Sequence, residues 1–240
     1  MTDGCSSERR KEIEENLDRV RRTIADAERA AGRAPGEVTL IGVTKTMPVE
    51  DINAALDHGL AIVGENRAQE LLEKLPQIHP QQVHFIGTLQ SNKVKYLAGC
   101  VDMIQSASSL ALLREIDRQA TRAGRVLEIL LEVNIGAEES KSGFAPEQVP
   151  QALEAAAGYA NLRVRGLMAI PPAGRPAAET TAYFTKMQKL FIDNQRKLSD
   201  NINMTYLSMG MSGDFAEAIR EGANMVRVGT AIFGKRNYLV

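Results

Sequence analysis

The stretch MTYLSMGMSGDFAEAIREGANMVRVGTAIF, residues 204–233, contains one structural unit twice. An apolar run predicts a strand over 204–207, a glycine-rich turn follows it, and a helix begins near Asp214. A second apolar run predicts a strand over 225–228, and a short helix follows near Ala231. Strands that alternate with helices in this way are typical of a parallel sheet covered by helices.

The same alternation extends back through the chain. Apolar runs predict six earlier strands, each followed by a helix, at residues 38–43, 61–63, 83–86, 101–104, 126–133 and 162–168. A long amphipathic helix precedes the first of them, because apolar residues recur every three or four positions from Ile13 to Ala27. Short strands that are almost continuously apolar are typical of sheets that are buried on both faces.

Eight such units match an α/β fold of one domain, a closed (β/α)8 TIM barrel. The alternative is a doubly wound open sheet, which usually has fewer strands and a Gly-x-Gly-x-x-Gly turn after its first strand. Neither feature is found in this sequence. We therefore expect a single barrel domain over residues 8–240, preceded by a polar tail at residues 1–7.

The composition excludes several classes of function. The 240 residues include 29 Lys and Arg and 30 Asp and Glu, so we expect no nucleic-acid or membrane partner. No apolar run approaches the ~18 residues of a membrane span, and the polar N-terminus lacks the apolar core of a secretory signal. Cys5 and Cys100 form no disulfide framework, which favours the cytoplasm. With only three histidines beside them, we expect no metal site.

Hydroxyl groups and glycines gather where the last two predicted strands end. Ser208 and Ser212 follow the seventh strand, and Gly229 and Thr230 follow the eighth. Barrel active sites lie at the carboxyl ends of the strands, and phosphate is often bound after strands seven and eight. Ser212 or Thr230 alone could be a helix N-cap, but the pair at these two positions favours a site for a phosphate group.

Two cationic residues are predicted beside this site. Lys45 follows the first strand, which neighbours the eighth in a closed barrel. A lysine amine among apolar side chains favours its neutral form, which can form a Schiff base with a carbonyl group. Arg227 interrupts an apolar strand, and it either pairs with a distant carboxylate or donates to a ligand in the barrel mouth.

A phosphate-bearing aldehyde would suit the phosphate site, the lysine and the arginine together. Two interpretations follow: an aldolase that acts on a sugar phosphate through a Schiff base, and a protein that holds pyridoxal 5′-phosphate (PLP). Arg227 slightly favours PLP, because a guanidinium group can face a ring nitrogen.

A series of short motifs runs through nearly the whole chain. They are Val43–Lys45, Gly64–Asn66, His84–Gly87, Leu89–Lys93, Ser140–Gly143, Gly166–Met168, Ser208–Ser212, Arg227–Gly229 and Phe233–Gly234. In this order and spacing, the chain resembles the pyridoxal phosphate homeostasis protein family. The resemblance implies a barrel of the alanine racemase N-terminal type, fold type III of the PLP proteins, with PLP held on Lys45 as a Schiff base.

The resemblance also implies a set of cofactor-binding residues. The set is Lys45, Asn66, Met168, Ser208, Ser212, Arg227, Gly229 and Thr230. Within it, Ser212, Gly229 and Thr230 contact the phosphate with Ser208 near them, while Arg227 lies by the pyridine nitrogen and Asn66 lies near the ring.

Other residues have simpler interpretations. Asn66 can also cap a helix over 66–75, because Gln69 follows three residues later as in a capping box. We expect His84 to be a hydrogen-bonded core residue. We expect Lys93 to be solvated and Lys141 to pair with neighbouring acids.

The family resemblance implies a regulator of PLP supply and amino-acid balance, with PLP-dependent apoenzymes as recipients and no established catalysis. The alternative is a PLP-dependent amino-acid racemase. Enzymes of the alanine racemase type carry a second, β-rich domain that supplies a catalytic tyrosine, whereas this chain ends after its last predicted helix. Neither Tyr206 nor Tyr238 is placed as a second base, and an open barrel mouth would not exclude water. We therefore expect a monomer without catalytic residues.

Overall fold

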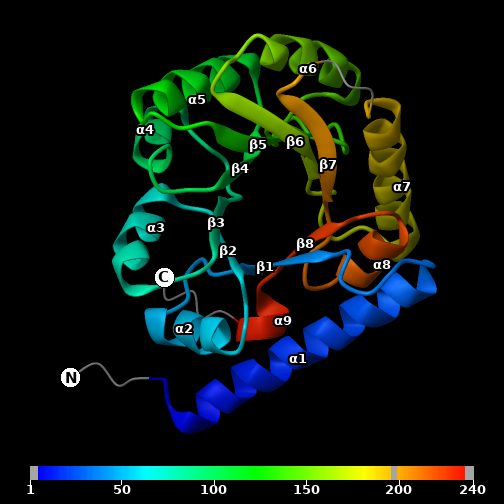
Figure 1. Cartoon of the computed structure of the whole chain (residues 1–240). Helices are drawn as coiled ribbons and strands as arrows, with labels where there is room; N and C mark the ends of the chain where they lie inside the picture. Colours follow the sequence, from blue (N-terminus) through cyan, green and yellow to red (C-terminus); the bar gives the residue numbers. More distant parts are fainter. Residues whose placement is uncertain (1–4, 196–198, 236–240) are drawn as a thin grey trace.

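Eight parallel strands close into a barrel in the computed structural model, which describes residues 5–195 and 199–235 (Figure 1). Each strand pairs with its neighbours in the chain, and β8 pairs with β1. This confirms the predicted (β/α)8 barrel of one domain. The strands are β1 (Thr39–Val43), β2 (Ile62–Glu65), β3 (Gln82–Phe85), β4 (Met103–Ala107), β5 (Leu127–Val133), β6 (Leu162–Ala169), β7 (Ile202–Ser208) and β8 (Met225–Val228).

Helices surround the barrel (Figure 1). Each turns an apolar face inward; in α5, for example, the buried residues recur at spacings of three and four. The α-helices are α1 (Ser7–Ala30), α2 (Val49–Asp57), α3 (Ala68–Lys74), α4 (Val94–Leu97), α5 (Leu110–Arg122), α6 (Val149–Ala157), α7 (Ala177–Asp193), α8 (Phe215–Arg220) and α9 (Thr230–Phe233). Three 3-10 turns are η1 (Leu75–Gln77), η2 (Ser91–Lys93) and η3 (Pro146–Gln148).

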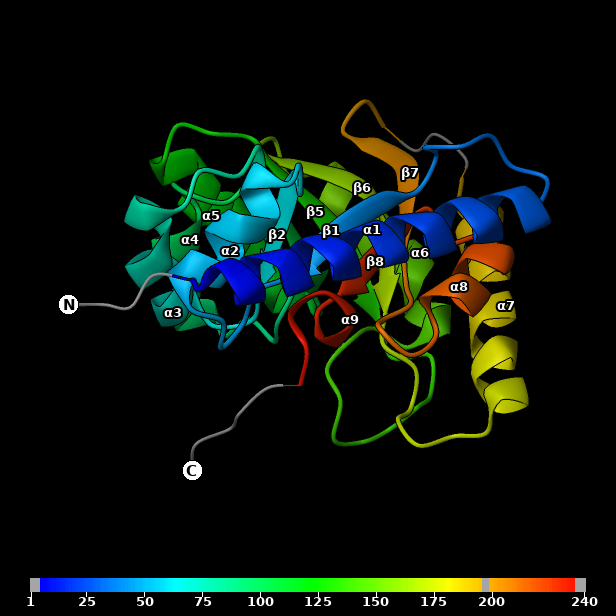
Figure 2. The same cartoon turned by 90° about the horizontal axis from the view of Figure 1, so that it is seen from below.

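The helix α1 lies across the outside of α2, α9 and α8 (Figures 1 and 2). The side chain of Arg9 donates to the carbonyl of Phe233 at 2.7 Å, and that of Asn16 donates to the carbonyl of Ile232 at 3.0 Å. Because α9 has only four residues, α1 covers the part of the barrel that a longer last helix would cover. Within residues 5–195 and 199–235, no helix is long and apolar enough to cross a membrane.

Several predicted boundaries differ from the observed ones. The predicted strand 101–104 extends instead to Ala107, because Gln105 is buried and hydrogen-bonded inside the barrel although it is polar. After the sixth strand the sequence predicts a helix from residue 178 to about residue 198, but the observed α7 ends at Asp193, where the Asn194 side chain donates to the carbonyl of Leu190 at 2.8 Å. Residues 196–198 and residues 1–4 of the predicted tail lie outside the described residues.

The inside of the barrel is filled by an apolar layer. Alternate residues of a strand face inward, and this layer is separate from the main core between barrel and helices. It consists of Ile41, Met103, Leu130, Met168 and Met225. Polar side chains lie beyond this layer, toward the carboxyl ends of the strands, where barrels carry their sites.

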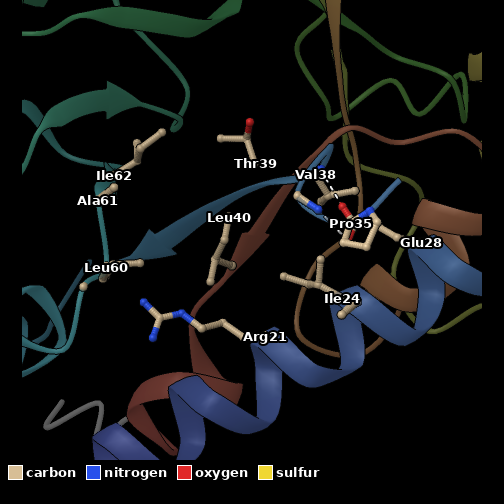
Figure 3. Close-up of a pocket in the computed structure, with 13 residues that line it drawn as sticks. Arg21, Ile24, Glu28, Pro35, Val38, Thr39, Leu40, Leu60, Ala61 and Ile62 are labelled. Carbon is tan, nitrogen blue, oxygen red and sulfur yellow. Dashed lines mark hydrogen bonds between the residues drawn. The ribbon is translucent and has the colours of Figure 1, made fainter. Parts of the chain in front are cut away.

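A cavity of about 440 Å³ lies between α1 and the start of β1 and β2 (Figure 3). Ile24, Leu40 and Leu60 form apolar walls, and Arg21 extends toward them from α1. None of the predicted cofactor residues lines it. It lies where the strands begin, which is the end of a barrel that serves stability rather than chemistry.

Candidate functional site

The strand register brings the predicted cofactor residues to one end of the barrel. β1 pairs with β8 up to Gly42 and Val228, so Lys45 and the loop of Gly229 leave the barrel side by side. β1 also pairs with β2, which brings Asn66, the residue after β2, to the other side of Lys45. Lys45 is half-buried in the turn that follows β1. The loops after β5 and β6 extend from the same end (Figure 2).

The loops after β7 and β8 meet at Ser212. The hydroxyl oxygen of Ser212 accepts hydrogen bonds from the backbone N–H groups of Gly229 and Ala231, both at 3.2 Å. Neither Ser212 nor Thr230 is an N-cap, because Asp214 and Gly229 occupy those positions in α8 and α9. The N-cap interpretation is therefore wrong in position, but the Ser212 oxygen does satisfy the Ala231 N–H group in the first turn of α9. Ser212 thus joins the loop after β7 to the start of α9, and its hydroxyl can donate to an acceptor such as a phosphate oxygen.

Arg227 is buried, with 3% of its surface exposed, and it donates to Ser208 and to the backbone of β6. Its Nη1 atom lies 2.6 Å from the Ser208 hydroxyl oxygen, and its Nη2 atom lies 2.9 Å from the Ala169 carbonyl. Burial lowers the pKa of Arg227 to about 10, while the charges of Asp214 and Glu132 oppose this shift. Within the described residues, the two hydrogen bonds of the Arg227 guanidinium go to neutral oxygens, so no carboxylate there forms an ion pair with it.

A chain of buried polar groups continues from Ser208 across the barrel. The Ser208 hydroxyl donates to the Gln105 oxygen at 2.7 Å, and the Gln105 amide nitrogen lies 3.0 Å from His84 Nδ1. His84 Nδ1 must then accept, which assigns the ring proton to Nε2, 3.2 Å from the Gln82 oxygen. The structure thus brings Ser208 to Arg227 and Gln105 rather than to the Ser212 loop. Sequence reasoning missed Gln105; its only signal was a polar residue beside an apolar run.

His84 is a hydrogen-bonded core residue, as predicted, and it gives stability a pH dependence. Burial lowers its pKa to about 4 in the folded protein, against about 6.5 for the unfolded chain. The unfolded state therefore binds the proton more readily, so this contribution to stability is present above about pH 6.5 and is lost toward about pH 4. Between about pH 7.5 and about pH 5, we expect the unfolding free energy to fall by about 2 kcal/mol through His84.

A His84→Gln variant is the matched control, because glutamine can accept from Gln105 and donate to Gln82 without titrating. Urea denaturation of both proteins at the two pH values measures the difference. An equal loss of stability in the wild type and in His84→Gln would contradict the expectation.

Asn66 does not cap a helix, so that prediction is wrong. α3 begins at Ala68 with Arg67 at the N-cap position, and no side chain makes a capping bond there. Instead, the Asn66 side-chain oxygen is buried and has no hydrogen-bond partner among the described residues. A buried acceptor without a donor is costly, and Asn66 follows β2 at the same end of the barrel as Lys45.

The remaining polar residues near the mouth have partners within the protein. Lys141 forms an ion pair with Glu138, as predicted, and donates to the Pro171 carbonyl at 3.2 Å. The amine of exposed Lys93 lies 5.9 Å from the ring centre of Tyr96. In the part of the chain that the structure describes, no group of three or more His, Cys, Asp or Glu could hold a metal ion.

Comparisons with known proteins identify the family of this chain. The family model described as "Alanine racemase, N-terminal domain" matches residues 12–237. A relative from Aquifex aeolicus is 42% identical over 226 residues, 93% of this chain and 98% of its own length. A Pseudomonas aeruginosa relative is 40% identical over 228 residues, 94% of this chain and 96% of its own. Both are named "Pyridoxal phosphate homeostasis protein".

Solved structures extend the comparison. PipY of Synechococcus elongatus, solved with PLP bound, has a TM-score of 0.79 and 34% identity, over 92% of this chain and 100% of its own. An alanine racemase of Clostridium difficile has a TM-score of 0.73 at 14% identity, so it shares the fold; this chain covers 58% of it. The barrel is therefore of the alanine racemase N-terminal type, and the chain belongs to the pyridoxal phosphate homeostasis protein family.

Proposed function

We propose that this protein binds PLP at the carboxyl end of its barrel and serves in PLP homeostasis and amino-acid balance without catalysing a reaction. The observation that carries the proposal is the meeting of three features on one rim. They are the half-buried Lys45, the Ser212 hydroxyl that joins the loops after β7 and β8, and the buried Asn66 oxygen that lacks a donor among the described residues. Membership of the family and the PLP-bound relative support the same ligand.

The residues present fit the chemical groups of PLP. The Ser212 and Thr230 hydroxyls would donate to the phosphate, and the N–H groups of Gly229 and Ala231, which donate to the Ser212 oxygen, would hold that serine in place. The Asn66 side chain would lie near the ring, where its amide nitrogen can donate to the ionised ring oxygen. Met168, fully buried inside the barrel, supplies apolar surface for the ring.

Arg227 would lie beside the ring nitrogen of PLP, with Ser208 next to it. Arg227 remains charged near pH 7, because its pKa of about 10 lies well above that value. Its hydrogen bonds to Ser208 and Ala169 hold the guanidinium in one orientation.

The Lys45 amine would retain the ligand covalently. The amine nitrogen bonds to the aldehyde carbon to give a Schiff base and one water molecule leaves, so retention is strong but reversible. PLP supplies an electron sink when it is bound. A site that holds the aldehyde reversibly suits storage and delivery, and we propose PLP-dependent apoenzymes as the recipients.

The same geometry gives no support to racemisation. A two-base racemase needs a second acid or base opposite the lysine. Tyr206 lies within β7, where Arg165 stacks 5.5 Å from its ring centre, and Tyr238 lies outside the described residues. We also propose that the protein is a monomer. The free thiols of Cys5 and Cys100 are consistent with the cytoplasm that we propose.

Two measurements on the purified protein test the proposed function: its absorption spectrum and its rate of turnover with an amino acid. PLP bound to a lysine gives a visible absorption band that borohydride removes, whereas a sugar-phosphate aldolase gives none. With alanine in deuterium oxide, we expect racemisation and proton exchange to stay at the level of free PLP. Rapid, stereospecific exchange would place the protein among the enzymes instead.

The phosphate contacts give a separate prediction. Hydrogen bonds to a charged group contribute about 1.5–3 kcal/mol each, so replacing Ser212 and Thr230 with alanine should weaken PLP retention at least about tenfold. Lys45 should still form its covalent bond. The control replaces Thr23 and Thr181, whose hydroxyls donate to carbonyls of their own helices. If dialysis shows that both double variants retain PLP equally well, then Ser212 and Thr230 do not bind the phosphate.

A further inference from the structure

A buried cluster of charged residues holds the backbone next to Lys45. The Lys74 amine on α3 lies 2.9 Å from the Glu65 carboxylate and 2.6 Å from the Glu70 carboxylate. It also donates to the backbone carbonyl of Thr44 at 2.8 Å. Glu65 is fully buried and Lys74 is nearly so. The three donors of the amine are therefore all used inside the protein.

The two carboxylates of this Lys74 cluster bind the residues on either side of Lys45. The Thr44 hydroxyl donates to Glu65 at 2.8 Å, and the backbone N–H of Thr46 donates to Glu70. The side chain of Lys45 takes no part in these bonds. The cluster therefore fixes the backbone before and after Lys45 and leaves the Lys45 amine to a ligand.

The turn at Thr46 requires such a restraint. Its φ angle is +62°, in the left-handed region that β-branched residues rarely adopt. Residues keep this conformation only where surrounding contacts over-determine it, and the bond from the Thr46 N–H to Glu70 is a contact of that kind. The conformation of this turn decides the direction in which the neighbouring Lys45 side chain leaves the backbone.

Fixing α3 to the barrel does not by itself explain the charges. Buried ion pairs are often no more stabilising than apolar residues of similar size. Burial raises the pKa of Glu65, and the charge of Lys74 opposes that shift, so the carboxylate depends on the lysine. Apolar side chains could hold α3, but they could not bond the Thr44 carbonyl and the Thr46 N–H group.

We propose that Lys74 is a positioning residue for Lys45. Through Glu65 and Glu70 it holds the turn at Lys45 in one conformation, so that the amine meets an aldehyde ligand in one orientation. The inference rests on the proposed role of Lys45 and extends it to residues that do not contact the ligand. Positioning of this kind acts mainly on the rate at which the covalent bond forms.

Four variants separate positioning from damage to the fold. Lys74→Met removes the charge at similar volume, and the double variant Lys74→Met, Glu65→Gln removes it without leaving a buried unpaired carboxylate. Glu70→Ala affects a partly exposed residue and removes the contact to Thr46. Lys74→Arg keeps the positive charge and two-carboxylate bonding. Lys95→Met, on an exposed lysine of α4, is the control.

The experiment mixes the PLP-free full-length chain with PLP and follows the visible band by stopped flow. Borohydride reduction and mass spectrometry then locate the adduct, and urea denaturation confirms that each variant is folded. We expect Lys74→Met, its double variant and Glu70→Ala to form the Lys45 adduct at least about tenfold more slowly. Lys74→Arg should recover most of the rate, and Lys95→Met should match the wild type.

The outcomes distinguish this inference from the proposed function. A wild-type adduct on Lys45 with unchanged rates in the folded variants would overturn the positioning role alone. A wild-type adduct on another lysine, or no adduct, would overturn the proposed function and the positioning role together. If Lys74→Met does not fold, the double variant and Glu70→Ala decide between the same outcomes.

Discussion

A Lys45→Ala variant will fold and will carry no PLP adduct after borohydride reduction. Lys45 lies in a turn at the end of the barrel that carries chemistry rather than stability, and its side chain is half-buried. Its removal therefore takes away the only amine that we assign to the aldehyde, while the buried Lys74 cluster keeps the turn in place. Mass spectrometry of reduced, digested protein measures the result directly.

The control for this prediction is Lys93→Ala, because Lys93 is exposed near the same end of the barrel. Its adduct should equal that of the wild type. An adduct found on Lys93 or Lys141 in the wild type would contradict the assignment of Lys45. An adduct in Lys45→Ala at the same yield as in the wild type would contradict it as well.

The second large effect concerns the ring nitrogen of PLP. PLP withdraws electrons best when this nitrogen is protonated, and a neighbouring cation opposes that protonation. Two unit charges about 4 Å apart repel by about 4 kcal/mol at an effective dielectric constant of about 20, which equals about three pKa units. Arg227 is buried and charged, so the wild type should hold the ring nitrogen unprotonated near neutral pH.

Replacing Arg227 with glutamine tests this expectation. Glutamine removes the charge but keeps an amide donor for the Ala169 carbonyl, and we expect the pKa of the ring nitrogen to rise by up to about three units. Arg227→Lys keeps a positive charge and is the control. The nitrogen chemical shift of labelled PLP reports protonation in each protein. A protonated ring nitrogen in the wild type would return Arg227 to a purely structural role.

The strands whose ends carry the site could be predicted because their signal is local. The run at 225–228 is bounded by Asn224 and Gly229, and the structure has β8 over the same residues. Lys45 and Ser212 followed from the general rule that barrel sites lie at strand ends. Such inferences need only the order of strands, which the alternation of apolar runs provides.

The polar interior could not be predicted, because its partners lie far apart in the chain. Gln105 bonds to His84, 21 residues away, and to Ser208, 103 residues away. Without knowledge of those partners, a polar residue such as Gln105 at the end of an apolar run favours a loop. The predicted strand therefore stopped at residue 104, whereas β4 extends to Ala107. Asn66 was mistaken for a cap for a similar reason: β2 extends to Glu65 because Lys74 and Thr44 satisfy that buried carboxylate.

The position of α1 has a consequence for how the chain folds during synthesis. α1 leaves the ribosome before the other described helices, yet its side chains bond to carbonyls 216 and 224 residues further on. Contacts between such distant segments form late and leave apolar surface uncovered until then. The same last segment carries Arg227, Gly229 and Thr230. One late event therefore covers α1 and completes the proposed PLP site, so we expect a chain to acquire PLP only after its barrel has closed.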